Sequence, residues 1–461
     1  MEASARARWL FPRAEGGEPR PARLCETMRL DHVGRSPVEL IVRASSPMPL
    51  LNPPPPRRAS PGQLDLHQLS TLEPFRHDDR PLRIALVTEY YYPHLGGICE
   101  HVHFLAREAR RRGHHVDIVT SHIPGASEQP NVIRVGRSQP IYSNGSQARI
   151  TLGWGLRRQM RRVLRDGRYD IVHAHSPLTP VLPLLAIEEA ACPVVGTFHT
   201  YFDRSFAYRL GRRFFQRRLE TLGAAIAVSN STTVALRRYF DADWKVIPNG
   251  IDTDVFNPGA PQPPQLSRDV PTILFLGRFD PRNGLATLIE SFRLIKGRGS
   301  GRRRARLVVV GDGPLRNHYH RQAKGDPDII FVGPVLERRP SYYAHSSVYA
   351  CPTTKASFGI TLLEAMACET PVVCSDILGF RDVVANEREA LMVPCGDRDA
   401  LADALVRVLD DGALATRLGT RGRLTALEYS WATVASRVLD VYHAVLGTAA
   451  AEARPLRTAW R

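Results

Sequence analysis

RIALVTEY at residues 83–90 and TILFLGRF at residues 272–279 decide the fold, because each begins a series of short apolar runs. The first series continues with VDIVT (116–120), DIVHAHS (170–176), PVVGTFHT (193–200), AIAVSNS (225–231) and WKVIPNG (244–250). The second continues with ARLVVVGDG (305–313), IIFVG (329–333), SVYACPT (347–353) and PVVCSD (371–376). Continuous apolar strands separated by helical stretches indicate parallel sheets covered on both faces. Each series therefore predicts a doubly wound domain.

The chain of 461 residues is long enough for such a pair of domains. The predicted fold class is α/β, with two tandem Rossmann-like doubly wound domains facing across a cleft. The predicted parts are a disordered extension (1–80), a first Rossmann-like domain (81–257), a second Rossmann-like domain (258–446) and a tail (447–461). Ligands of such sheets bind at the carboxyl ends of the strands, so the active site is expected in the cleft.

The net charge of +16 comes almost entirely from arginine, since Lys245, Lys296, Lys324 and Lys355 are all the lysines. This charge alone does not choose among nucleic acid, anionic lipid and a diphosphate substrate. No apolar run is long enough for a signal peptide or a membrane span, and the cysteines form no C-x-x-C pair. The sequence therefore predicts a cytoplasmic enzyme whose membrane contact, if any, is peripheral.

Three loops contain side chains suited to a phosphorylated ligand. Gly96-Gly97 precedes a helix, where backbone amides approach a phosphate, although a tight turn explains these glycines equally well. GRFDPRNG (277–284) places Arg278 after a strand, where a guanidinium suits a diphosphate; two loop arginines in an arginine-rich chain are the simpler alternative. FGITLLEAMA (358–367) carries Glu364 one turn into a helix, either as an acceptor for a ribose hydroxyl or as a solvated residue.

These motifs occur in an order that resembles the retaining GT-B glycosyltransferases of family 4. The similarity covers residues 83 to 446 and is clearest to the phosphatidylinositol mannosyltransferases. The shared signatures are Gly-Gly at 96–97, GTFHT at 196–200, AVS at 227–229, IPNGID at 247–252, FLGRFD at 275–280 and SFGITLLEAMA at 357–367. The resemblance implies a hexosyltransferase that moves a sugar from a nucleotide sugar, with GDP-mannose favoured, onto a phosphatidylinositol-type lipid. It also implies that the first domain (81–257) binds the acceptor and the second (258–446) binds the nucleotide sugar.

The resemblance also assigns roles to single residues. His199 would be catalytic and lie against the transferred sugar. The implied donor-binding residues are Gly97, Arg278, Asn283, Gly359, Ile360 and Glu364. Two positions depart from the family: Asn283 replaces a lysine, and Ala356 replaces the first acid of E-x7-E. Loss of that acid argues against a glycosyl intermediate on this residue and favours a front-face displacement, in which the leaving diphosphate assists deprotonation of the acceptor.

YSNGSQARITLG (142–153) is similar to the stretch with which these mannosyltransferases hold the phosphoinositol head group. The acceptor-binding residues so implied are Tyr142, Asn144, Ser146 and Arg149. Arginine beside hydroxyl and amide donors also suits a phosphate on physical grounds, whereas a glycine turn ahead of a helix is the alternative.

The segment that follows is predicted to be an amphipathic helix. Leu152, Leu156, Met160 and Val163 fall on one face at helical spacing. The other face carries the predicted membrane-contact residues Arg157, Arg158, Arg161 and Arg162, and also Arg165. Such a helix is typical of an interfacial contact with anionic lipid, with its apolar face either in the membrane or on the core; an ordinary solvated helix is the alternative.

The expected partners are a nucleotide-sugar donor, an anionic phospholipid acceptor and the cytoplasmic membrane surface. Nucleic acid is not expected, because basic and aromatic residues are not interleaved. No metal site and no obligatory cofactor are predicted, since Asp241-Ala-Asp243 has no nearby ligand in the sequence and is expected in a surface loop. Two alternatives remain open: a UDP-sugar-dependent transferase acting on another lipid or a soluble acceptor, and a weakened enzyme that binds sugar nucleotide or lipid.

Overall fold

The computed structural model describes residues 80–94, 96–143, 146–179, 181–200, 205–266, 269–297 and 305–452. The extension predicted for residues 1–80 therefore lies outside the described residues, apart from Arg80. Among the helices of these ranges, none combines the length and the apolar character needed to cross a membrane.

The first domain is built on an eight-stranded sheet with the strand order β4-β3-β2-β1-β5-β6-β7-β8. Its strands are β1 (Arg83–Val87), β2 (His115–His122), β3 (Val132–Ser143), β4 (Ser146–Leu152), β5 (Ile171–His175), β6 (Val194–Phe198), β7 (Ala224–Ala227) and β8 (Trp244–Val246). All neighbours are parallel except β3 and β4, which form an antiparallel pair at the edge. The sequence predicted a parallel sheet and did not anticipate this edge pair.

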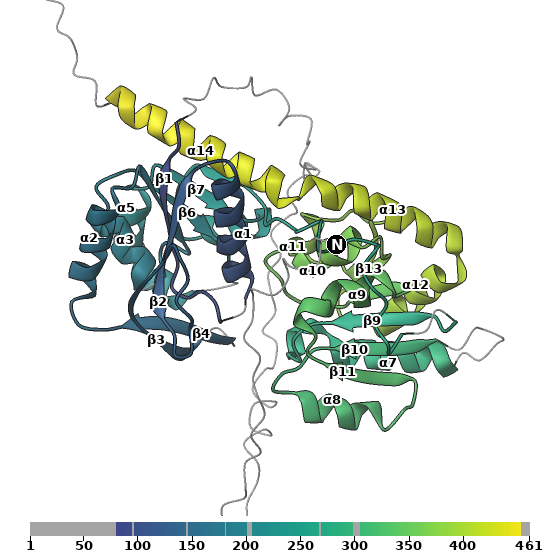
Figure 1. Cartoon of the computed structure of the whole chain (residues 1–461). Coiled ribbons are helices and arrows are strands. Elements are labelled where there is room, and N and C mark those ends of the chain that lie inside the picture. The colour runs from purple at the N-terminus through teal and green to yellow at the C-terminus, as the bar shows by residue number, and fades with distance from the viewer. Residues whose placement is uncertain are drawn as a thin grey trace, which may run out of the picture. The chain divides into compact units, whose positions relative to one another are not determined.

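Helices cover both faces of this sheet (Figure 1). They are α1 (Gly97–Arg111), α2 (Leu156–Gly167), α3 (Leu182–Glu189), α4 (Phe206–Leu210), α5 (Arg212–Leu219) and α6 (Asn230–Arg237). Successive residues of a strand point to opposite faces, so the buried run of β1 supplies two cores. Ile84 and Leu86 pack with α1, whereas Ala85 and Val87 pack with α2 and α3.

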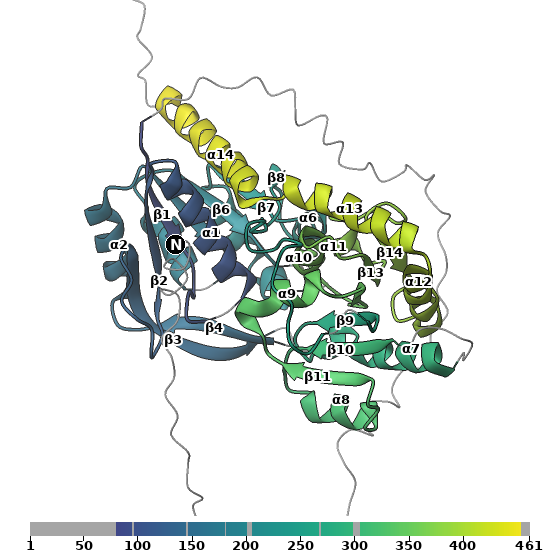
Figure 2. The same ribbon diagram turned by 45° about the vertical axis from the view of Figure 1, so that its right-hand side comes forward.

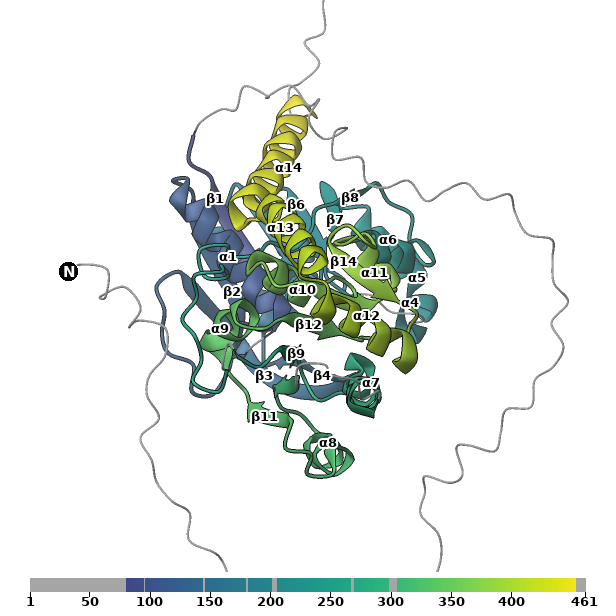
Figure 3. The same cartoon turned by 90° about the vertical axis from the view of Figure 1, so that its right-hand side faces the viewer.

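The second domain has a six-stranded parallel sheet with the order β11-β10-β9-β12-β13-β14. Its strands are β9 (Thr272–Leu276), β10 (Arg306–Val310), β11 (Ile329–Gly333), β12 (Val348–Cys351), β13 (Val372–Ser375) and β14 (Ala390–Val393). Its helices are α7 (Leu285–Gly297), α8 (Arg316–Ala323), α9 (Arg339–Ala344), α10 (Ile360–Ala367), α11 (Leu378–Arg381), α12 (Arg398–Asp410) and α13 (Gly412–Glu428), with 3-10 turns η2 (Pro281–Asn283) and η3 (Leu336–Arg338). Figure 2 shows β9, β10 and β11 side by side, and Figure 3 shows α7 beside α12.

The last helix, α14 (Trp431–Glu452), packs on the first domain although it follows the second in the sequence. Trp431, Val438 and Tyr442 join the core formed by α1 and β1. The helix continues to Glu452, so the segment predicted as a tail from residue 447 begins inside it.

Both sheets confirm the predicted pair of Rossmann-like domains, and both reverse their strand order at one point. The reversal falls between β1 and β5 in the first sheet and between β9 and β12 in the second. In open α/β sheets, ligands bind outside the carboxyl ends of the strands at such a switch point. The loops after β1, β5, β9 and β12 are therefore the places to look for a site.

Candidate active site

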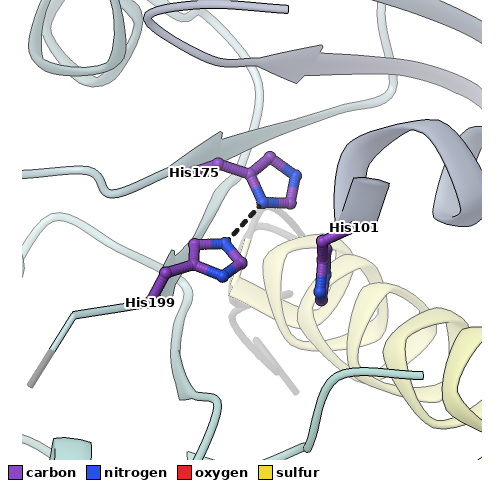
Figure 4. A group of neighbouring side chains, drawn as sticks. All are labelled: His101, His175 and His199. Atoms are coloured by element: carbon purple, nitrogen blue, oxygen red, sulfur yellow. Dashed lines mark hydrogen bonds between the residues drawn. The ribbon is translucent and has the colours of Figure 1, made fainter. Parts of the chain in front are cut away.

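His199 lies just beyond the carboxyl end of β6, beside the end of β5. Parallel pairing sets His175 opposite Thr197, so the two strand ends lie next to each other. Nδ1 of His175 and Nε2 of His199 are 3.1 Å apart and share a hydrogen bond. The ring of His101, from the first turns of α1, lies across both, with centroids 4.8 Å from His199 and 5.3 Å from His175 (Figure 4).

Burial makes these imidazoles poor bases. It lowers the pKa of His101 to about 4, despite the hydrogen bond that Nδ1 of His101 donates to Asn249, which acts in the opposite direction. Burial also lowers the pKa of His175 and His199 well below the usual value, and the neighbouring histidines add to the effect. A neutral ring of such low basicity is suited to hydrogen-bonding a sugar or acceptor hydroxyl rather than to removing a proton.

A fourth histidine, His173, supports this group from below. Its ring stacks on His175 with centroids 4.3 Å apart. Its Nδ1 is 2.6 Å from the Tyr442 hydroxyl of α14, and its Nε2 is 2.6 Å from Oγ1 of Thr197. Both ring nitrogens are thus used within the protein, so His173 positions its neighbour and has no nitrogen left for a ligand.

Gly96 and Gly97 lie at the other side of the same switch point, where β1 leads into α1. Gly96 has a φ of 170°, which any residue adopts, and a Cβ added to either glycine meets nothing within 4 Å. Neither backbone geometry nor protein packing therefore requires glycine here. Gly97 begins α1, whose first amides have no partner within the helix, so an anion can approach them closely.

Glu364 is held in the interior of the second domain on α10, with 1% of its surface exposed. Its Oε1 accepts from Arg339 at 2.7 Å, and its Oε2 accepts from the Tyr343 hydroxyl at 2.9 Å. The second nitrogen of Arg339 donates to Oε1 of Glu100 at 3.0 Å. Glu100 precedes His101 on α1, so the first turns of this helix contact both the histidine group and the Glu364 pair.

The loop after β9 contains Arg278 and Asn283. Arg278 is exposed, and its carbonyl accepts from Nδ2 of Asn283 at 2.7 Å. Asn283 thus uses one amide hydrogen to fix the backbone beside Arg278. Gly284, which follows, has a φ of +73°, and a Cβ there would lie 2.0 Å from the carbonyl oxygen of Pro352. Only glycine permits this approach of the loop to the end of β12.

Gly359 and Ile360 begin α10, on the loop that follows β12. Gly359 is buried and Ile360 is half-buried. This loop also contacts the first domain, because Oγ of Ser231 donates to the carbonyl oxygen of Ser357 at 2.8 Å. The first turn of α6, which follows the AVS motif, therefore meets the SFG motif before α10.

Of the predicted acceptor residues, Tyr142, Ser146 and Arg149 lie on the β3–β4 pair rather than in a turn ahead of a helix. Asn144 is outside the described residues, and Tyr142 and Ser146 are placed only as strand positions on β3 and β4. Nε of Arg149 donates to Oγ of Ser138 at 2.6 Å. Its charge also helps burial to lower the pKa of His94, which lies in the loop before Gly96. Arg149 is therefore close to the glycine loop.

The predicted amphipathic helix is shorter than expected. It begins at Leu156, and Leu152 belongs to β4, where half of its surface is exposed. The prediction that Leu152 lies on this helix was wrong, because the antiparallel edge strand β4 continues as far as Leu152. Met160 and Leu164 are buried, so the apolar face packs on the core and not outward.

The arginines of α2 fall into two kinds. Arg157 pairs with Glu188 and Glu189 of α3, and Nε of Arg161 lies 2.5 Å from Oε2 of Glu189. Arg162 pairs with Asp166 one turn later in its own helix. Arg158 is exposed and has no carboxylate partner among the described residues. Trp154, just before the helix, has 97% of its surface exposed.

Sequence reasoning missed His101, His175, Glu100 and Arg339. The signal for His175 was present, because HAH ends the strand next to GTFHT and parallel strands end at one edge. HVH after Gly-Gly was a weaker signal for His101, since it required α1 to lie over that edge. No sequence signal joined Arg339 to Glu364, because their contact depends on the packing of α9 on α10.

Comparisons with known proteins agree with this arrangement. Residues 95–255 match the model of Glycosyltransferase Family 4, and residues 270–411 match that of Glycosyl transferases group 1. The phosphatidyl-myo-inositol mannosyltransferase of Mycobacterium tuberculosis is 33% identical over 376 residues, covering 80% of this chain and 98% of that protein. The D-inositol 3-phosphate glycosyltransferase of Xylanimonas cellulosilytica is 30% identical, covering 75% and 91%. The structure of Anabaena HepE with UDP and glucose superimposes with a TM-score of 0.62 at 18% identity, covering 78% and 98%.

Proposed function

Because the chain belongs to glycosyltransferase family 4, we propose that it transfers mannose from GDP-mannose to phosphatidylinositol with retention of the anomeric configuration. The protein is a glycosyltransferase with the GT-B fold, and enzymes of this type use nucleotide-sugar donors. GDP-mannose, the lipid acceptor and retention are the proposed parts. The relatives named phosphatidyl-myo-inositol mannosyltransferase, whose name supports mannose and the lipid acceptor, match this chain over nearly their whole length. GDP and retention rest on the resemblance of the motifs to family 4.

The observation that carries the proposal is the position of Glu100 and His101 on α1. Glu100 is joined through Arg339 to Glu364, the proposed ribose acceptor. His101 packs on His199, the proposed catalytic residue. The same helix begins at Gly97, where the donor diphosphate would meet unpaired amides. The first turns of α1 therefore lie beside the proposed positions of the ribose, the diphosphate and the reacting sugar.

The proposed chemistry is a front-face displacement. The bond between the anomeric carbon and the diphosphate oxygen breaks, and the acceptor hydroxyl oxygen bonds to the same face. The hydroxyl proton passes to the leaving phosphate oxygen, which is the base, because neutral His199 is too weakly basic for this role. Arg278 and the amides before α1 and α10 stabilise the charge that develops on the diphosphate. His199 orients a hydroxyl by a hydrogen bond.

Arg149 supports a phosphorylated acceptor, because its guanidinium lies near the glycine loop and is anchored by Ser138. A lipid acceptor places the enzyme at a membrane, and we propose a peripheral contact on the cytoplasmic face through Trp154 and the exposed arginines of α2. An exposed indole beside arginine suits the interface of an anionic bilayer.

A soluble inositol phosphate is the second candidate acceptor. It is favoured by the 30% identity to a relative named as a D-inositol 3-phosphate glycosyltransferase. Such a molecule offers Arg149 the same phosphate without a lipid tail. A UDP-sugar donor belongs to this alternative as well, since HepE, a protein of the same fold, was solved with UDP.

The test combines two donors with two acceptors. The purified full chain is given labelled GDP-mannose or UDP-glucose, together with phosphatidylinositol vesicles, phosphatidylcholine vesicles as control, or inositol 3-phosphate. The proposal predicts labelled lipid only with GDP-mannose and phosphatidylinositol, and an α-linked product from the α-linked donor. Transfer to inositol 3-phosphate alone would show that the acceptor is the soluble inositol phosphate and not the lipid. Transfer from UDP-glucose alone would show that the donor is a UDP-sugar and not GDP-mannose.

A further inference from the structure

His101, His175 and His199 form a group whose nitrogens are placed as metal ligands. One ring nitrogen from each lies within 4.8 Å of the others. The three side chains come from α1, the end of β5 and the residue after β6, so rigid elements hold them. Figure 4 shows His175 and His199 joined by their hydrogen bond, with the ring of His101 edge-on beside them. In tetrahedral coordination, nitrogens about 2.0–2.1 Å from zinc lie about 3.4 Å apart, so the rings would rotate to bring the three nitrogens to one ion.

Two of these rings keep a nitrogen without a protein partner. Nδ1 of His101 is 2.9 Å from Oδ1 of Asn249, which only accepts, so the proton is on Nδ1 and the lone pair is on Nε2. Nε2 of His101 is buried and has no hydrogen-bond partner among the described residues. Nε2 of His175 is likewise buried without a partner in the described structure. Buried unpaired nitrogens are costly in a protein interior.

The contrast with His173 shows that this feature is not general to the buried histidines here. His173 is equally buried, yet Tyr442 and Thr197 occupy its two nitrogens. Metal-binding histidines usually donate their second ring nitrogen to an acceptor that fixes the tautomer and the ring orientation, and Asn249 is such an acceptor for His101. The group thus has ligand atoms and a supporting contact, and a bound ion would replace the hydrogen bond between Nδ1 of His175 and Nε2 of His199.

We propose that His101, His175 and His199 together bind one divalent transition-metal ion of the Zn²⁺ class, and that the bound ion inhibits sugar transfer. Three neutral imidazoles without a carboxylate select zinc, copper or nickel over magnesium, calcium or manganese, which prefer oxygen. Three protein ligands leave a fourth position for water. Inhibition rests on the proposed role of His199, whereas binding of the ion does not.

The test measures binding and transfer separately on the full chain stripped with a chelator. Zn²⁺ is titrated against a chromophoric chelator, and Co²⁺ is titrated for the absorption bands of a tetrahedral nitrogen site. The chain should bind one ion at this site, and Mg²⁺ in excess should not displace it. His101→Gln and His175→Gln should each weaken binding more than about 100-fold, and Asn249→Ala should weaken it about 10–100-fold. His318→Ala, on an exposed helix position, is the matched control.

Circular dichroism identifies variants that fail to fold, and Asn249→Ala and His101→Gln then test the site independently of His175→Gln. Equal Zn²⁺ binding in the chain and in the folded variants would overturn the proposal, as would absence of binding and of cobalt bands in the chain. Zn²⁺ should abolish transfer and a chelator should restore it. Binding without inhibition would overturn the inhibitory part and the role of His199, whereas transfer without Zn²⁺ binding would leave the proposed function standing.

Discussion

Arg339 donates to Oε1 of Glu364 across 2.7 Å, and the Glu364 carboxylate is buried while 28% of the Arg339 side chain is exposed. A buried acceptor that loses its hydrogen-bond donor costs about 1–3 kcal/mol. Arg339→Met should therefore destabilise the second domain. It should also raise the KM for the donor about tenfold or more with a smaller change in kcat, because Glu364 loses the contact that orients it.

The measurement is a donor titration together with chemical unfolding. Arg338→Met is the matched control, since Arg338 is adjacent and exposed. An Arg339→Met enzyme with the normal KM and stability would show that the pair neither orients Glu364 nor stabilises the fold.

The contribution of Glu364 to the free energy of unfolding should depend on pH. Burial raises the pKa of this carboxyl to about 7, although Arg339 lowers it. In the unfolded chain the group titrates near 4.5, so between these values the native state keeps a proton that the unfolded state loses. The free energy of unfolding should therefore fall as the pH rises from about 5 to 7, by at most about 1.4 kcal/mol per pH unit from this group. Glu364→Gln removes this contribution.

Unfolding of both proteins at several pH values provides the check. The difference in stability should shift in favour of the glutamine variant as pH rises. A difference independent of pH would mean that Arg339 outweighs burial and keeps the carboxylate ionised throughout.

Asn283 should act through the loop that carries Arg278. Its side chain fixes the carbonyl of Arg278 at 2.7 Å, and loss of one such bond costs about 0.5–1.5 kcal/mol. Asn283→Ala should therefore raise the KM for the donor about 2–10-fold. Asn317→Ala, at an exposed position of α8, should leave it unchanged. Unaltered donor affinity in Asn283→Ala would remove this residue from the donor site.

The two kinds of arginine on α2 should separate in a vesicle-binding assay. Arg158→Gln with Arg162→Gln should weaken sedimentation with phosphatidylinositol vesicles about fivefold per residue, and the effect should shrink at high salt. Arg157→Gln with Arg161→Gln should instead lower Tm, because Glu189 loses both arginines and Glu188 keeps only Arg218. The membrane role of α2 fails if the first pair binds vesicles as the unaltered chain does.

Much of this fold was predictable, because strands buried on both faces appear as continuous apolar runs. RIALVTEY contains β1, and TILFLGRF contains β9. Each is the first strand of its sheet in the sequence and lies beside the switch point of that sheet. The loops after these strands lie at the switch points, so the positions of Gly97 and Arg278 could be predicted, while their roles in donor binding stay predictions. The antiparallel β3–β4 pair could not, because the same residues alternate too weakly to distinguish an edge strand from a loop and helix.

The site was less predictable, because its contacts join elements far apart in the sequence. His101 and His199 are separated by 98 positions and meet only because α1 crosses the ends of β5 and β6. Arg339 looked like one more arginine in an arginine-rich chain. Its role depends on the packing of α9 against α10 and on α1 of the other domain.

The central claim is tested most directly by the rate at which labelled mannose passes from GDP-mannose into lipid on phosphatidylinositol vesicles. The full chain is compared with His199→Ala and with His122→Ala, an exposed histidine at the end of β2. The account predicts labelled lipid from the full chain and from His122→Ala, and a loss of about 100-fold or more in His199→Ala. Equal rates in all three, or no labelled lipid from the full chain, would contradict it.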